Sequence, residues 1–90
     1  MARLVPLQEA TNLVLEKLTH KQLANLLGVS PSQVYKYAVG DTTSPKETVV
    51  DAFYDNCYIG EDRILIDFYK DEQDYLRYRK MRGIGLPDID

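Results

Sequence analysis

The sequence has 90 residues, enough for one small domain with a single modest core. Hydrophobic residues make up 44% of it and charged residues 28%, an ordinary balance for a globular protein that argues against intrinsic disorder. No apolar run has the length needed to span a membrane, and the N-terminus lacks the apolar stretch of a signal peptide, so we expect a cytoplasmic protein that does not contact membranes.

The formal net charge of −3 at pH 7 argues against strong non-specific binding to nucleic acid, because phosphate neutralisation supplies most of such affinity. The charges of residues 1–60 nearly balance, which still allows a local basic face. The single cysteine, Cys57, cannot form an internal disulfide, which fits a reducing compartment. We interpret it as a buried structural side chain.

In chain order, residues 1–6 are predicted to form a short arm, and residues 7–18 a first helix. Apolar residues recur there at helical spacing: Leu7, Ala10, Leu13, Val14 and Leu18. We expect this apolar stripe to support the helices that follow.

Residues 19–40 predict two short helices joined by a tight turn. The first begins at Thr19, which forms a capping-box pair with Gln22, three residues later. Gly28 follows it and can supply the positive φ that a tight turn between helices needs.

The second of these helices has the capping-box spacing of Ser30 and Gln33, with Pro31 at its first turn, where a missing N–H costs nothing. Val34 and Tyr37 can pack against the first helix, which leaves the other face exposed. This is the pattern of a helix-turn-helix, whose second helix commonly enters the DNA major groove.

Several residues in this region occur together in a known pattern: Leu18-Thr19, Leu23-Ala24, Leu27-Gly28-Val29-Ser30, Val34, Gly40 and Pro45. Over about residues 18–53 the sequence resembles the Cro/C1-type helix-turn-helix family of phage and bacterial repressors. The resemblance implies a four-helix, DNA-binding transcriptional repressor that acts as a homodimer on a double-stranded operator. It would be located in the bacterial nucleoid, or in the host cytoplasm if it comes from a phage.

The start of the second helix of the pair would face the floor of the groove. The residues predicted to contact bases are Ser30, Pro31, Ser32, Gln33, Tyr35 and Lys36. Lys36 can pair with guanine O6 or N7, and Gln33 can pair with adenine unless the capping box occupies its amide.

The resemblance also implies phosphate contacts from the start of the first helix of the pair and from the loop after the second. By position these residues are Thr19, His20, Lys21, Thr42, Thr43 and Lys46. Helix N-terminal amides suit phosphate equally well. The alternative for His20 is a plain surface residue.

Residues 44–47 have the form of a third capping box, with Pro45 in the first turn of a helix that continues to about Asn56. The apolar face of this helix would be Val49, Val50 and Phe53.

Residues 61–82 lie beyond the resemblance. Their acidic residues come first and their basic residues last, an order that complements a helix macrodipole and predicts one long helix ending at Gly83. A competing interpretation makes residues 63–68 a strand, because Ile64, Ile66 and Phe68 alternate with other positions. We favour the helix.

The predicted fold is therefore all-α: a four-helix domain over residues 1–60, a helical extension over 61–82 and a mobile tail over 83–90. The extension has more apolar surface than a compact domain needs to cover, so we expect it to mediate dimerisation. The predicted interface is Ile64, Leu65, Phe68, Tyr75 and Tyr78. The alternative is that the extension packs on its own domain. The basic residues between 77 and 82 would form a solvated helix end, contact phosphate, or pair with acidic residues of a partner subunit.

The sequence does not favour catalysis. It has one His, one Cys, no glycine-rich phosphate loop and no metal-ligand spacing, so we expect no enzyme activity, no cofactor and no metal ion. Two alternatives to a repressor remain. One is an adaptor that binds another protein through the extension, and the other is a DNA-recognition subunit of a phage packaging complex.

Overall fold

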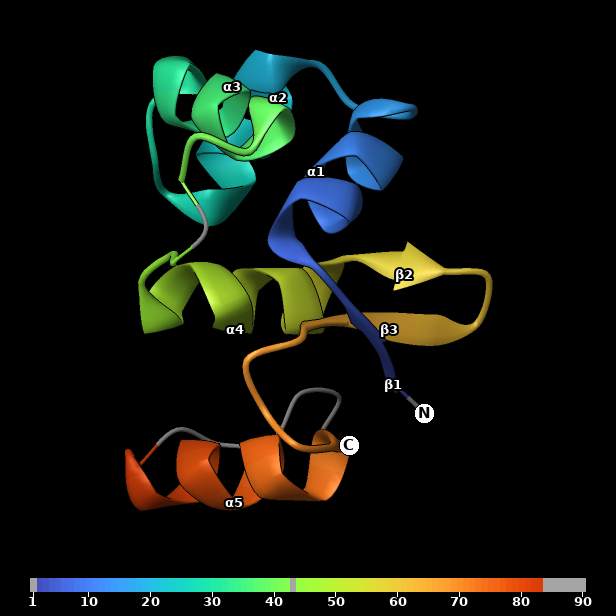
Figure 1. The fold of residues 1–90 in the computed structure, drawn as a ribbon, viewed down its shortest axis with the longest axis vertical. Helices are drawn as coiled ribbons and strands as arrows, with labels where there is room; N and C mark the ends of the chain where they lie inside the picture. Colours follow the sequence, from blue (N-terminus) through green and yellow to red (C-terminus); the bar gives the residue numbers. More distant parts are fainter. Residues whose placement is uncertain (1, 43, 84–90) are drawn as a thin grey trace.

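The computed structural model describes residues 2–42 and 44–83, so Thr43 and residues 84–90 of the predicted tail lie outside it. Within this part of the chain there are five helices and three strands (Figure 1). In chain order they are β1 (Ala2–Val5), α1 (Leu7–Leu15), α2 (His20–Leu27), α3 (Pro31–Val39), α4 (Glu47–Asn56), β2 (Tyr58–Ile59), β3 (Asp62–Ile66) and α5 (Glu72–Met81).

The prediction of an all-α fold is wrong, because the described chain contains a mixed sheet with the strand order β1-β3-β2. β1 runs parallel to β3, with Ala2 opposite Arg63 and Val5 opposite Ile66. β2 runs antiparallel to β3, with Tyr58 also opposite Arg63. The expected N-terminal arm is thus a strand of this sheet.

The long helix predicted over residues 61–82 is also wrong, and the competing strand interpretation was closer. The central strand β3 carries Ile64, Leu65 and Ile66, all fully buried. A strand buried on both faces loses the polar alternation that a half-exposed strand shows, which hid it in the sequence. The helix begins only at Glu72, after Asp71 accepts a 2.8 Å hydrogen bond from the Asp74 N–H.

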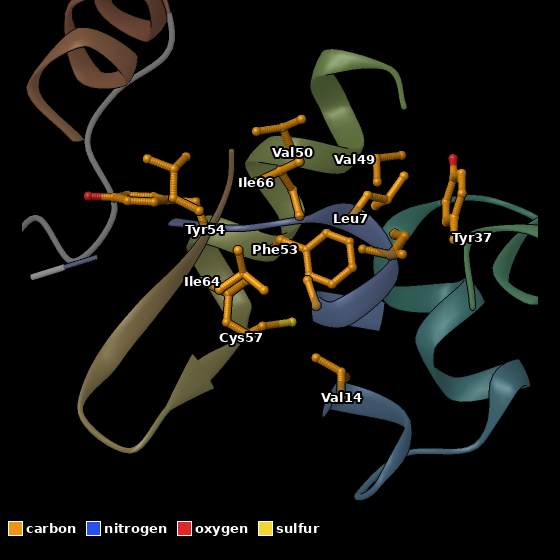
Figure 2. Close-up of a cluster of buried hydrophobic side chains, with 14 of the residues drawn as sticks. Leu7, Val14, Tyr37, Val49, Val50, Phe53, Tyr54, Cys57, Ile64 and Ile66 are labelled. Carbon is orange, nitrogen blue, oxygen red and sulfur yellow. The ribbon is translucent and has the colours of Figure 1, made fainter. Parts of the chain in front are cut away.

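The core lies mainly between the sheet and the first four helices, and Tyr75 of α5 also belongs to it. Figure 2 shows the ring of Phe53, from α4, surrounded by Leu7 and Val14 of α1 and by Ile64 and Ile66 of β3. Phe53 is completely buried, so this contact packs α1 and α4 against the sheet.

α5 lies at the opposite end of the molecule from α2 and α3 (Figure 1). It contacts the sheet where the Ala2 N–H donates to Glu72 Oε1 at 3.2 Å, and its other hydrogen bonds to the rest of the domain go mainly to α4. None of the described helices has the length and apolar character that crossing a bilayer requires.

Candidate nucleic-acid interface

The turn between α2 and α3 has the geometry that the sequence predicts. The Gln22 N–H donates to Thr19 Oγ1 at 3.1 Å, and the Thr19 N–H donates to Gln22 Oε1 at 2.9 Å, so this capping box is confirmed. Gly28 ends α2 in the left-handed region at a φ of 72°. α2 therefore starts and stops at fixed residues, and α3 leaves it at a defined angle.

α3 begins at Pro31 and is capped by Ser30, whose Oγ accepts a 3.2 Å hydrogen bond from the Gln33 N–H. The Gln33 side chain does not complete the box. Its Nε2 instead donates to Thr42 Oγ1 at 3.5 Å, and the side chain also bonds to Tyr37. Burial raises the pKa of Tyr37, and this bond from Gln33 partly offsets the rise. The Gln33 amide is thus held toward the loop after α3 rather than left free for adenine.

The remaining predicted base contacts lie on the outer face of α3. Val34 and Tyr37 face the core, whereas Ser30, Pro31, Ser32, Tyr35 and Lys36 are exposed. Tyr35 is 58% exposed, the largest exposed ring on this helix. This face presents hydroxyl, aromatic and ammonium groups, which are all used to contact base edges.

A hollow of about 480 Å³ lies between the starts of α3 and α4, next to this face. Its polar lining comes from both helices and from the loop between them: Ser30, Gln33, Thr42, Ser44, Lys46 and Thr48. Hydroxyl groups and a lysine ammonium suit an anionic oxygen. The structure therefore brings the predicted phosphate residues Thr42 and Lys46 to the start of α3.

The predicted third capping box at residues 44–47 does not form. α4 starts at Glu47 with Lys46 as its N-cap, and Lys46 makes no side-chain capping bond. Pro45 therefore precedes the helix instead of starting it. Ser44 and Thr48 line the hollow instead, a role that the sequence analysis missed because it assigned Ser44 to the cap.

The other predicted phosphate residues lie around the start of α2. Thr19, His20 and Lys21 are exposed there, and none of the three lines the hollow. Among the described residues, the predicted phosphate contacts thus form two groups, one at the start of α2 and one at the hollow beside α3.

The residues predicted for the dimer interface separate into two sets. Ile64, Leu65 and Tyr75 are completely buried in the chain's own core and offer no surface to a partner in this fold. Phe68 and Tyr78 are 50% and 42% exposed.

Two arginines at the C-terminal end of α5 pair with acidic residues of α4, a contact that the sequence analysis missed. Arg79 lies 2.7 Å from Asp55, and Arg82 lies 2.9 Å from Asp51. Burial alone would raise the pKa of Asp51, but hydrogen bonds from Arg82 and Tyr75 outweigh it and hold this pKa below its ordinary value. The regular spacing of Glu47, Asp51 and Asp55 along α4 was the available signal.

Comparison with known proteins found no family model, no curated protein and no solved structure that matches this chain. The functional argument therefore rests on the geometry of α2, α3 and the hollow beside them.

Proposed function

We propose that this protein binds double-stranded DNA through α3 and acts as a sequence-specific transcriptional regulator. One observation carries the proposal: the exposed start of α3 adjoins a polar hollow that contains Lys46. A helix that reads bases in the major groove needs phosphate contacts beside it to fix its position, and this arrangement supplies both.

In this proposal the exposed face of α3 lies in the major groove. The Lys36 ammonium is suited to guanine O6 or N7, and the Ser32 hydroxyl can donate to or accept from a base edge. The ring of Tyr35 is suited to apolar contact with a thymine methyl group. Lys46 and Thr42 contact phosphates of the DNA strand that runs beside α3. His20 and Lys21 contact phosphates of the DNA backbone near the start of α2.

Few basic side chains contribute to these phosphate contacts, since the chain as a whole is acidic. We expect affinity to come from a small number of phosphate contacts and to require a second copy, because one recognition helix reads too few base pairs to be selective. Phe68 and Tyr78 are the residues of the predicted dimer interface that remain exposed, and a homodimer contact would be built from them.

The proposal is tested by titrating duplex DNA with Lys36→Ala and with Lys17→Ala as its control. Both lysines are exposed, but Lys17 lies beyond the end of α1 and outside the hollow. Lys36→Ala should weaken binding to a selected site about tenfold, whereas Lys17→Ala should bind as the wild type does. Equal affinities for both variants would rule out α3 as the reading helix.

A second candidate, favoured by the net charge of −3, is an adaptor that binds another protein instead of DNA. The two candidates differ at low salt. A regulator binds DNA more tightly as salt is removed, whereas an acidic adaptor does not bind it at all.

A further inference from the structure

A row of acidic side chains on α4 faces α5. Glu47, Asp51 and Asp55 are spaced four residues apart, so they share one side of the helix. We call these three residues the acidic row. Arg82 Nε lies 3.0 Å from Glu47 Oε2, and its two terminal nitrogens donate to both oxygens of Asp51 at 2.9 and 3.1 Å.

The C-terminal residue of the acidic row, Asp55, forms an ion pair with a buried arginine. Arg79 donates to both carboxylate oxygens of Asp55, at 2.7 and 3.1 Å, and its side chain is only 4% exposed. Its guanidinium also lies 5.8 Å from the ring centroid of Tyr54 and 6.0 Å from that of Tyr75. α5 is thus held against α4 largely by charged and aromatic groups.

The N-terminal residue of the acidic row, Glu47, lies next to the candidate DNA interface. Glu47 is the first residue of α4 and follows Lys46, whose side chain lines the hollow beside α3. Glu47 is 46% exposed and would oppose a DNA phosphate at this place unless a cation compensated it. Arg82 is that cation.

We propose that α5 is an electrostatic clasp, in which Arg82 neutralises the acidic row beside Lys46 and so raises the affinity of the helix-turn-helix for DNA. This inference rests on the proposed function. Because coupling between two equilibria is reciprocal, DNA binding in turn favours the docked position of α5. The clasp thus links the C-terminal helix to the DNA-binding face without touching DNA itself.

The test compares the DNA affinities of Arg82→Gln and Lys80→Gln in the full chain at about 50 mM salt, where surface charges are only weakly screened. Both variants remove one positive charge at the C-terminal end of α5, but Lys80 is exposed and forms no ion pair within the described part of the chain. Arg82→Gln should weaken binding about fivefold, while Lys80→Gln should change it less than twofold. Adding Glu47→Gln to Arg82→Gln should restore most of the affinity, because the net charge beside Lys46 returns.

Hydrogen exchange gives a second readout, which a merely structural role for Arg82 would not change. Saturating DNA should slow the exchange of α5 amides in the wild type, and this slowing should be lost in Arg82→Gln. If Arg82→Gln fails to fold by circular dichroism, Glu47→Gln alone is measured, and it should bind DNA about twofold more tightly.

Each of four results would overturn this proposal. If Arg82→Gln and Lys80→Gln bind equally, or Glu47→Gln does not rescue the first, the clasp fails while DNA binding by the wild type stands. If Glu47→Gln alone leaves the affinity unchanged, the acidic row does not oppose phosphate. If the wild type binds no DNA at low salt, the proposed function fails and the clasp fails with it.

Discussion

The guanidinium of Arg79 meets the carboxylate of Asp55 through two hydrogen bonds, across the contact between the last helix and α4. Arg79 is 3% exposed, so the pair attaches α5 in a setting from which water is largely excluded. This contact makes the C-terminal helix part of the folded domain rather than an appendage to it.

Asp55→Ala should destabilise the fold by about 2 kcal/mol, because it leaves Arg79 buried without its main partner. We place the cost below that of a fully buried pair because the Asp55 side chain is 32% exposed. Arg3→Ala is the control. It breaks the exposed pair with Asp62, where the side chains are 57% and 37% exposed, and should cost less than about 0.5 kcal/mol. Urea unfolding at pH 7 measures both, and equal costs would contradict this account of α5.

Asp51 should make stability depend on pH in the acid range. Its pKa in the folded protein lies below the ordinary value of 3.8, so the folded state stabilises the charged form. This stability is fully present above the ordinary pKa and is lost as the pH falls through the lower, folded value. Melting temperatures of the wild type should therefore drop below about pH 4, and those of Asp51→Asn should drop less. Parallel pH profiles for the two proteins would show that Asp51 is not responsible.

Thr19 and Ser44, both predicted from the sequence to cap a helix, should respond differently to mutation. Thr19→Ala removes one side of a complete capping box and should cost about 1 kcal/mol. Ser44→Ala should cost almost nothing, because α4 begins after Lys46 and has no side-chain capping bond to lose. Thermal unfolding of both variants decides between this structure and the third capping box expected from the sequence, which would give the two variants equal losses.

Cys57 should be unreactive in the native protein. Cys57 is 5% exposed, and burial raises the pKa of its thiol to about 11, so little thiolate forms at pH 8. A thiol-specific disulfide reagent should react slowly with the folded chain and rapidly in urea. Fast labelling without denaturant would mean that the junction between α4 and β2 opens readily.

The features that could be predicted from the sequence depend on residues that lie close together along the chain. Thr19, Gln22 and Gly28 define the α2 boundaries by local hydrogen bonding and φ, and the order of acidic and basic residues correctly placed a helix end near Gly83. The start of α3 at Pro31 was found for the same reason.

The sheet depends on contacts between distant segments. β1 has only four residues, and it is a strand because Ala2–Val5 pair with Arg63–Ile66 far along the chain. The acidic-to-basic order of residues 61–82 predicted one long helix, yet two of its arginines, Arg79 and Arg82, bind Asp55 and Asp51 of α4. The order of charges alone does not show whether the basic residues interact with the dipole of their own helix or with carboxylates elsewhere in the chain.

The central claim, that the start of α3 reads DNA, is tested most directly by selection from a library of random duplexes, followed by titration of the enriched sequence at two salt concentrations. The account predicts a shared motif among the selected duplexes, with an affinity that falls as salt rises and falls about tenfold in Lys36→Ala. A selection that enriches no motif, with no binding at low salt, would contradict it.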